Sequence, residues 1–454
     1  MTYYKRHIDE KLLEWKDGSR RKPLLIRGAR QVGKSTAVRE LGRTFKYYVE
    51  INLERQPSLK ALFTEDIDVK KTCSNLSATL AIPIIPGETL LFIDEIQSCQ
   101  TAIRALRYFK EDYPELHVIA AGSLLEFALD ELPSFAVGRI RSLYMYPFSF
   151  DEFLSAQGLD LQVRAKKDAT PDSTLIEPLH NRMKEQIRSY YLVGGMPAAV
   201  TEWIQSNNYS EVRRVHNDII DTYLDDFPKY KKRISPVLLR MVLDSAAHQA
   251  GSKFVYAQVS RDIHSSSIKE ALSLLSLAGL ITPVTHSDGN GLPLGAEANM
   301  SYQKYLFLDT GLMLTMLGTP ASDILLSSDT DLVNKGPLSE MFAGLEIIKY
   351  SDCFVKPSLF YWQHQSKNGN AEVDYLVGRD GRVLPIEIKA STRGSMQSLY
   401  LFMRKRHLEY AIRSSLENFA QFEHVDAEDN QALRHIDILP LYALSNLIIG
   451  DGSR

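Results

Sequence analysis

The sequence predicts an α/β multidomain protein that begins with a parallel sheet covered by helices on both faces. Over roughly the first 155 residues, short apolar runs alternate with helical segments, and the expected strands are LLIRG, YYVEINL, LLFIDE, HVIAAGS and RSLYMYPF. That alternation is typical of a parallel sheet with crossover helices. With 454 residues the chain is too long for one ordinary core, and its length suggests about three domains.

A phosphate-binding motif follows the first expected strand. Gly28 to Ser35 read G-x-x-x-x-G-K-S, after the apolar run Leu24–Ile26 and before a helical segment. The glycines let the loop curl around phosphates, Lys34 can reach the β and γ oxygens, and the Ser35 hydroxyl can ligate Mg²⁺ at the positive end of the next helix. The residues expected to bind ATP are Gly28, Ala29, Arg30, Gln31, Val32, Gly33, Lys34, Ser35 and Thr36.

Two carboxylates end another apolar run. Asp94 and Glu95 come directly after Leu90–Ile93, and an acid at the carboxyl end of a parallel strand points into the crevice where such sheets bind ligands. We expect Asp94 to hold Mg²⁺ through water and Glu95 to polarise the water that attacks the γ-phosphate. The pairing of Asp with Glu favours hydrolysis over binding alone.

Two further residues are candidates for catalysis. Ser123 ends the strand HVIAAGS and is placed to hydrogen-bond the γ-phosphate or the attacking water, although small polar residues also end strands without such a role. Arg139 follows Gly138 and can stabilise the charge of phosphoryl transfer, in cis or across a subunit contact. A structural arginine is the alternative, and Arg141 competes for the same role.

The composition limits the cellular setting. An apolar fraction of 44% with 24% charged residues is that of a water-soluble globular protein, and no window reaches the roughly 18 apolar residues of a membrane span. The N-terminal segment lacks a secretory apolar core. Cys73, Cys99 and Cys353 are too far apart to suggest disulfides or a zinc site, so we expect a cytoplasmic protein. A net charge of −3 leaves nucleic-acid binding to local basic patches.

The middle of the chain reads as helical. Leu159–Pro178 is polar and suits a linker, and helices are expected from there to about Pro236. The break at Gly194-Gly195 suits either contact with a nucleotide base or a plain turn between helices. From Ser235 to about Leu326 a helix pair followed by a glycine-rich turn and a strand predicts a winged helix. Its second helix has an apolar face and a barely basic outer face, so packing or partner binding competes with DNA reading.

A hairpin near the C-terminus carries the second chemical signal. Asp380-Gly381 is a favoured two-residue turn, and it places Asp374 opposite Glu387 and Glu372 opposite Lys389. The side chains of Asp374, Glu387 and Lys389 then converge on one face, where two carboxylates can hold Mg²⁺ near a lysine that orients water. Glu340 begins a helical segment and can add a third carboxylate. The alternative is an ordinary hairpin with a solvated face.

Taken together, the motifs resemble a prokaryotic family of AAA-type P-loop ATPases, similar to archaeal ATPases and STAND NTPases, that carry a C-terminal restriction-endonuclease-like domain. The resemblance rests on the ordered set RGARQVGKST, LLFIDEIQ, AGS, GR before YPFSFDEF, YYLVGGMP, KYLFLDTGL and EVD…IEIK. It implies ATP binding and hydrolysis, a helical lid and winged helix after the core, and a PD-(D/E)XK nuclease fold. That pattern maps onto Glu340, Asp374, Glu387 and Lys389, with Val373 in place of the usual proline.

The expected domains are a P-loop core over residues 1–158, a linker and helical lid over 159–234, a winged helix over 235–326 and a nuclease-like domain over 327–454. Two functions compete. The first is a Mg²⁺-dependent ATPase whose nucleotide state controls a nucleic-acid-directed module with nuclease chemistry. The second is an ATP-dependent switch or scaffold that binds DNA or protein through a silent nuclease-like domain. ATP is the expected ligand, DNA and a further copy or protein are candidate partners, and no membrane contact is expected.

Overall fold

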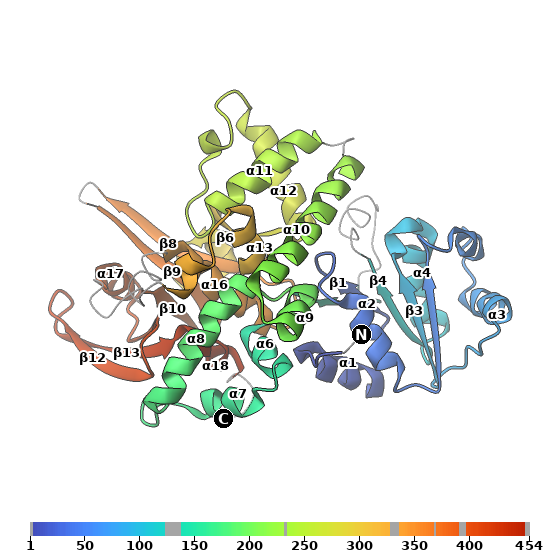
Figure 1. Ribbon diagram of the computed structural model, residues 1–454, viewed down its shortest axis with the longest axis horizontal. Coiled ribbons are helices and arrows are strands. Elements are labelled where there is room, and N and C mark those ends of the chain that lie inside the picture. Colours follow the sequence, from blue (N-terminus) through green and yellow to red (C-terminus); the bar gives the residue numbers. More distant parts are fainter. Residues whose placement is uncertain are drawn as a thin grey trace. The chain divides into compact units, whose positions relative to one another are not determined.

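The computed structural model describes residues 3–122, 138–230, 234–326, 336–366, 369–389 and 396–449 (Figure 1). It divides into two compact units, which are described separately. Unit 1 comprises Met1–Pro147 with the short segments Leu277–Gly279 and Asp352–Lys356, and unit 2 comprises the rest of the chain from Phe148 onward.

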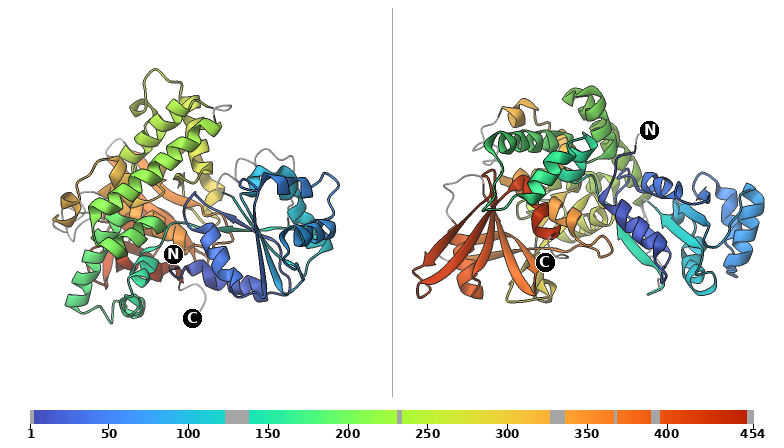
Figure 2. Two further views of the ribbon diagram at one scale, coloured as in Figure 1. Left: turned by 45° about the vertical axis from the view of Figure 1, so that its right-hand side comes forward. Right: turned by 90° about the horizontal axis from the view of Figure 1, so that it is seen from below.

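Unit 1 is built on a parallel sheet of five strands in the order β2-β3-β4-β1-β5. These strands are β1 (Leu24–Arg27), β2 (Tyr47–Asn52), β3 (Thr89–Asp94), β4 (His117–Ala121) and β5 (Arg141–Tyr144). The helices are α1 (His7–Asp17), α2 (Lys34–Gly42), α3 (Val69–Leu80) and α4 (Gln100–Asp112). Figure 2 shows this sheet with helices on both sides. The predicted parallel sheet with covering helices is confirmed.

Side chains that point alternately to the two faces of the sheet are apolar on both faces, which explains why helices cover both. Leu25, Leu91 and Val118 pack against α3 and α4 in one apolar cluster, whereas their neighbours Leu24, Leu90 and Ile119 are also fully buried and point to the other face. A strand that is buried on both faces is typical of a parallel sheet between helix layers. β4 lies between β1 and β3, so the segments after these strands share one edge of the sheet.

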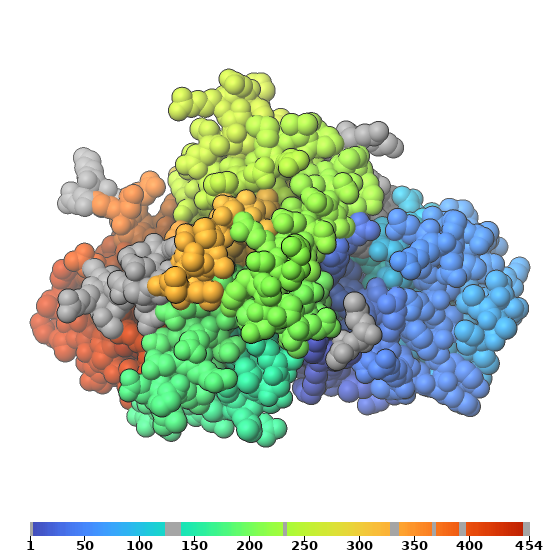
Figure 3. Space-filling view, in the orientation of Figure 1, coloured from blue at the N-terminus to red at the C-terminus, as the bar shows by residue number. Residues whose placement is uncertain are grey.

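The helices of unit 2 lie both before and between its strands in the sequence. Their bounds are α6 (Phe150–Ala156), α7 (Asp160–Asp168), α8 (Glu177–Val193), α9 (Pro197–Ser206), α10 (Tyr209–Asp226), α11 (Pro236–His248), α12 (Ser265–Leu277), α13 (Thr310–Met316), α16 (Gly336–Tyr350) and α17 (Gln397–Arg406). Surfaces of α8 to α11 are in view in Figure 3. The segment expected as a linker instead contains α7, because Lys166 is fully buried and pairs with Asp151 at 2.5 Å. A lysine stem can be buried when its ammonium group is paired.

An eight-stranded mixed sheet organises the rest of unit 2, in the order β12-β13-β11-β10-β9-β8-β6-β7. Its strands are β6 (Ile281–Ser287), β7 (Ala298–Phe307), β8 (Leu359–Ser366), β9 (Gly369–Arg379), β10 (Arg382–Ile388), β11 (Tyr410–Ser415), β12 (Ala420–Asp426) and β13 (Ala432–Pro440). β6 and β7 are the strands of the expected winged helix, and β6 pairs with β8. One sheet therefore extends across the domain boundary expected near residue 326.

The expected helix pair before β6 is present only in part. The segment VYAQVSRDI contains a 3₁₀ turn at Tyr256–Gln258 in place of an α-helix, and α12 follows it. In α12 the residues Ile268, Leu272 and Leu275 are buried, while Lys269 and Glu270 are exposed. The predicted apolar face of this helix therefore lies in the core, and its outer face has no excess of basic residues.

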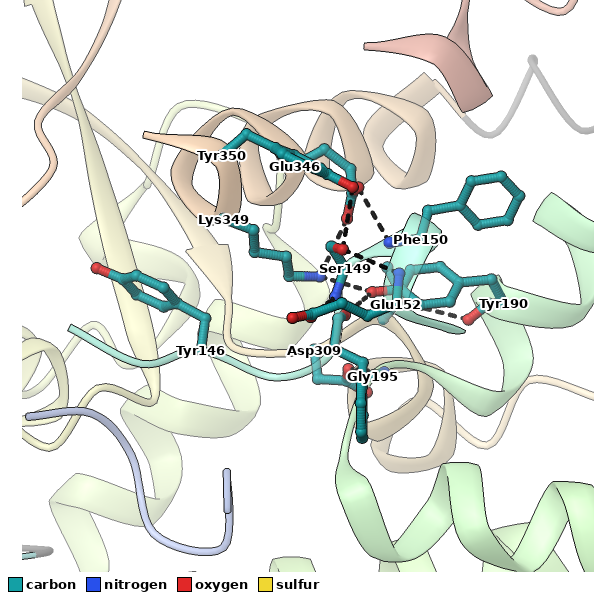
Figure 4. Close-up of polar contacts among 12 residues, drawn as sticks. Tyr146, Ser149, Phe150, Glu152, Tyr190, Gly195, Asp309, Glu346, Lys349 and Tyr350 are labelled. Atoms are coloured by element: carbon teal, nitrogen blue, oxygen red, sulfur yellow. Dashed lines mark hydrogen bonds and ion pairs between the residues drawn. The ribbon is translucent and has the colours of Figure 1, made fainter. Parts of the chain in front are cut away.

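Three of the short sequence motifs meet in a buried polar network of unit 2 (Figure 4). The Phe148 N–H donates to the Gly195 carbonyl at 2.7 Å, and the Gly195 N–H donates to Asp309 Oδ2 at 2.6 Å. In turn, the Phe150 N–H donates to Glu346 Oε2 at 3.1 Å. The network joins the starts of α6 and α13 to the turn between α8 and α9 and to α16. These hydrogen bonds favour the interpretation of Gly194-Gly195 as a turn between helices.

We expect Gly195→Ala to destabilise unit 2 by about 1–3 kcal/mol, because a Cβ there would lie 2.2 Å from the Phe148 carbonyl oxygen and backbone atoms would have to shift. Gly291→Ala is the matched control, since a Cβ at Gly291 meets open space and should change stability by no more than about 0.5 kcal/mol. Urea unfolding followed by circular dichroism measures both. Equal midpoints for the two variants would contradict the proposed close approach.

Candidate ATPase site and candidate metal centre

The loop between β1 and α2 has the backbone that the phosphate-binding motif requires. Gly28, Gln31 and Gly33 have φ angles of 138°, 64° and 98°, which curl the chain before α2 begins at Lys34. A Cβ on Gly28 would lie 2.1 Å from the Met145 carbonyl oxygen, so glycine is needed at that position. The first turn of α2 then directs its backbone N–H groups into the loop.

Lys34 lies inside this loop with 7% of its surface exposed. Its ammonium group donates to the carbonyl oxygens of Gly28 at 2.9 Å and Ala29 at 2.7 Å. Burial lowers the pKa of Lys34 to about 8, and the carboxylates of Glu95 and Asp94 oppose that shift. The lysine is thus held at the position from which it can contact a phosphate.

Asp94 and Ser35 contact each other, as a shared Mg²⁺ site requires. The Ser35 hydroxyl donates to Asp94 Oδ2 at 3.0 Å, and the Asn52 side chain donates to the same oxygen at 3.4 Å. Burial, followed by the charge of Glu95, raises the pKa of Asp94. A hydroxyl and a carboxylate beside the lysine are suitable Mg²⁺ ligands. Ser35 at the start of α2 and Asp94 at the end of β3 are therefore brought together.

Glu95 follows Asp94 in a left-handed conformation with φ of 49°. The Gln97 amide donates to Glu95 Oε2 at 2.6 Å, which fixes one carboxylate oxygen. Sequence analysis did not identify Gln97 or Asn52. A signal for Asn52 was present, because it is a polar residue at the end of a strand, and β2 pairs it with Asp94. Ser123 lies outside the described residues.

Arg139 precedes β5, at the amino end of the parallel sheet. Arg141 begins β5 and pairs with Leu24 at the start of β1, whereas the phosphate-binding loop follows the other end of β1. Four residues of strand span roughly 10 Å. Arg139 precedes them and instead pairs at 3.1 Å with Glu111 in the last turn of α4. The ion pair with Glu111 favours a structural role for Arg139. A catalytic role for Arg139 or Arg141, in cis or across a subunit contact, stays a prediction.

The C-terminal hairpin has the predicted register. Asp380 and Gly381 have φ angles of 49° and 73°, as the two-residue turn requires, and the pairs run from Arg379↔Arg382 to Tyr375↔Ile386. Asp374 therefore lies level with Glu387. The Asp374 side chain also accepts a hydrogen bond of 2.7 Å from the Ile388 N–H. Residues 383–387 of β10 are buried in succession, so both faces of this strand are covered.

Acidic side chains gather beside this hairpin. Carboxylate oxygens of Glu340, Glu372 and Asp374, which we call the acid cluster, lie within 4.8 Å of one another. Glu387 is 2% exposed and pairs with Lys389 at 2.5 Å. Burial and the charge of Asp374 raise the pKa of Glu387 to about 8. Its Oε2 atom has no hydrogen-bond partner among the described residues. These donors fit a divalent metal ion such as Mg²⁺ or Mn²⁺.

Lys304 completes the acid cluster and was not identified from the sequence. It belongs to β7, is 2% exposed and pairs with Glu340 at 2.7 Å and with Glu372. The carboxylates raise the pKa of Lys304 even though its burial has the opposite effect. Glu372, expected opposite Lys389, therefore contacts a different lysine. No local sequence pattern links residue 304 to residues 340 and 372.

Two short basic runs, which begin at Lys229 and Arg404, are candidate phosphate contacts, and the first side chain of each is paired with an acid. Arg404 pairs with Asp426 at 3.3 Å and with Glu428, and Lys229 pairs with Asp226 at 2.7 Å. These pairs favour a structural role for the two side chains.

Comparison with known proteins identifies the first domain. Residues 20–154 match the family described as AAA domain, while residues 184–323 and 335–443 match two domains of unknown function, DUF8612 and DUF4143. The parallel sheet, loop and acidic strand end define a P-loop NTPase. The family match supports an AAA-type P-loop ATPase domain in this part of the chain.

Solved structures with some similarity include the Aeropyrum pernix ORC1 protein in complex with DNA, with 13% identity over 69% of this chain and 91% of that chain, at a TM-score of 0.27. The S. cerevisiae Hsp104–ADP complex shares 13% identity over 60% of this chain and 39% of its own, with a TM-score of 0.28. A variant of Thermotoga maritima RuvB shares 16% identity over 61% and 88%, with a TM-score of 0.27. No curated protein matches the chain. Among the described residues, no helix has the length and apolar character of a membrane span.

Proposed function

We propose that the protein is a Mg²⁺-dependent ATPase whose nucleotide state controls a nucleic-acid-directed C-terminal module with a divalent metal centre. The contact between the Ser35 hydroxyl and Asp94 beside the buried Lys34 carries the first part of this proposal. Mg²⁺, when bound, neutralises charge on the β- and γ-phosphates. Lys34 contacts those phosphates, Ser35 and Asp94 hold the ion, and Glu95 orients the attacking water.

The second part of the proposal rests on the residues beside the hairpin. Glu340, Asp374 and Glu387 would hold the divalent ion, which activates a water and neutralises charge at a scissile phosphate. Lys389, paired with Glu387, stabilises negative charge that develops there. The unpartnered Oε2 atom of Glu387 supports a cation at this position, since a buried carboxylate oxygen without a partner is costly. A phosphodiester of nucleic acid is the substrate class that this chemistry fits.

A specific observation also favours the alternative, an ATP-dependent switch or scaffold with a silent nuclease-like domain. Lys304 already pairs with two carboxylates of the acid cluster, and Arg404 and Lys229 are held by acidic neighbours. A scaffold needs neither a metal ion nor a free phosphate contact in unit 2. Metal binding therefore separates the two functions.

Lys34→Ala should weaken ATP binding by about 10- to 100-fold, because a charge-assisted hydrogen bond contributes about 1.5–3 kcal/mol. Glu95→Gln should retain binding but slow hydrolysis by about 10²- to 10⁴-fold, the usual contribution of a general base. Fluorescent-nucleotide titration and phosphate release measure the two effects. Wild-type turnover in Glu95→Gln would show that Glu95 does not position the water.

Asp374→Ala/Glu387→Ala should abolish Mn²⁺ binding by the C-terminal site and any metal-dependent cleavage of DNA, while ATP hydrolysis stays near the wild-type rate. Removal of one of two neighbouring carboxylates can also stabilise the metal-free protein, because their charges repel. The matched control is Asp380→Asn, since Asp380 lies at the exposed tip of the same hairpin. Calorimetry of the full chain with Mn²⁺ but without nucleotide gives the result. Identical heats in all three proteins would favour the scaffold.

A further inference from the structure

Lys304 brings a positive charge into the acid cluster from a distant part of the chain. Its ammonium group contacts Glu340 and Glu372, which are two of the three carboxylates whose oxygens lie within 4.8 Å of one another. We propose that Lys304 is an internal cation that holds these carboxylates together in the metal-free protein and competes with a divalent ion for them. This inference rests on the proposed metal centre.

The Lys304 ammonium group lies where it competes with a divalent ion for Glu340 Oε1. A divalent ion binds a carboxylate oxygen at roughly 2.0–2.6 Å, and the Lys304 Nζ atom lies 2.7 Å from Glu340 Oε1. An ion on the same oxygen would therefore lie close to a like charge, buried where solvent screens little. At Glu340 Oε1, either the ion is excluded or the ammonium group must leave.

The backbone of Lys304 limits how far that group can move. Lys304 pairs with Val284 on β6 and forms a bridge with Lys253 on its other side, so the strand is held on both edges. Its ammonium group also lies 5.0 Å from the centre of the Tyr361 ring, which offers a favourable face to a cation. Displacement by a metal ion is thus a rotation of the side chain away from Glu340 while β7 stays in place.

The same contacts explain how the protein folds without a metal. Three carboxylates at these separations repel one another, and partial burial limits how far water relieves the repulsion. One ammonium group between Glu340 and Glu372 offsets that cost. Lys389 performs the equivalent role for Glu387, at 2.5 Å. The two lysines differ in that Lys389 contacts one carboxylate, whereas Lys304 contacts two, Glu340 on α16 and Glu372 on β9.

The test compares Mn²⁺ binding by the full chain, stripped with EDTA and free of nucleotide, with binding by Lys304→Met. We expect at least tenfold tighter Mn²⁺ binding by the variant in calorimetry. Its melting temperature should be lower in EDTA and should rise more on addition of Mn²⁺. Lys253→Met is the control, because Lys253 is an exposed lysine of the same unit whose Nζ atom lies over Tyr302. It should bind Mn²⁺ as the wild type does.

Unchanged or weaker Mn²⁺ binding by Lys304→Met overturns the inference. If that variant does not fold, Glu372→Gln/Lys304→Met removes one charge of each sign, and it should bind Mn²⁺ at least tenfold more tightly than Glu372→Gln alone. Equal Mn²⁺ affinities of Glu372→Gln/Lys304→Met and Glu372→Gln also overturn the inference. Failure of the proposed metal centre itself gives a different result. In that case neither the wild type nor any Lys304 variant shows a heat of Mn²⁺ binding that is lost in Asp374→Ala/Glu387→Ala.

Discussion

Buried lysines that need carboxylate partners determine much of how unit 2 is assembled. Lys166, Lys304 and Lys349 have side chains at most 4% exposed, and each pairs with an acid. An ion without a partner in such a place costs several kcal/mol, so the segments that carry the partners cannot separate freely. Lys166 joins α7 to α6, and Lys304 joins β7 to α16. Lys349 pairs within α16 and also donates to the Tyr190 hydroxyl on α8.

Local patterns predicted the parts whose determinants are close in sequence. The phosphate-binding loop depends on glycines within eight residues, and the hairpin register depends on Asp380-Gly381, so both were accessible. The direction of β3 also predicted that Asp94, at its carboxyl end, lies beside the phosphate-binding loop. The contacts of Lys304 and Lys166 were not accessible, because their partners depend on how distant segments pack. A polar stretch around Lys166 reads as a linker until Asp151 is known to lie next to it.

Arg139 shows a different limit of prediction from sequence, because its position relative to the sheet can be read from the strand that follows it. Its position after Gly138 suggested a catalytic arginine, yet a residue that precedes a parallel strand lies at the amino end of the sheet, whereas the ligand edge is at the carboxyl ends. The rule that places Asp94 at the ligand edge therefore does not favour a role in cis for Arg139. The winged-helix segment is a further case, because strand alternation predicts β6 and β7 but not that β6 pairs with β8.

Helix α16 carries residues of both the acid cluster and the buried polar network of unit 2. Its first half carries Glu340 of the acid cluster, and Glu346, less than two turns later, accepts the hydrogen bond from the Phe150 N–H. Phe150 follows Met145 by five residues, and the Met145 N–H donates to the Arg27 carbonyl directly before the phosphate-binding loop. Coupling between sites requires a physical element that both sites bias. Within unit 2, the hydrogen bond from the Phe150 N–H to Glu346 fixes the start of α6 to the helix that carries Glu340, so a test of coupling can begin with that bond.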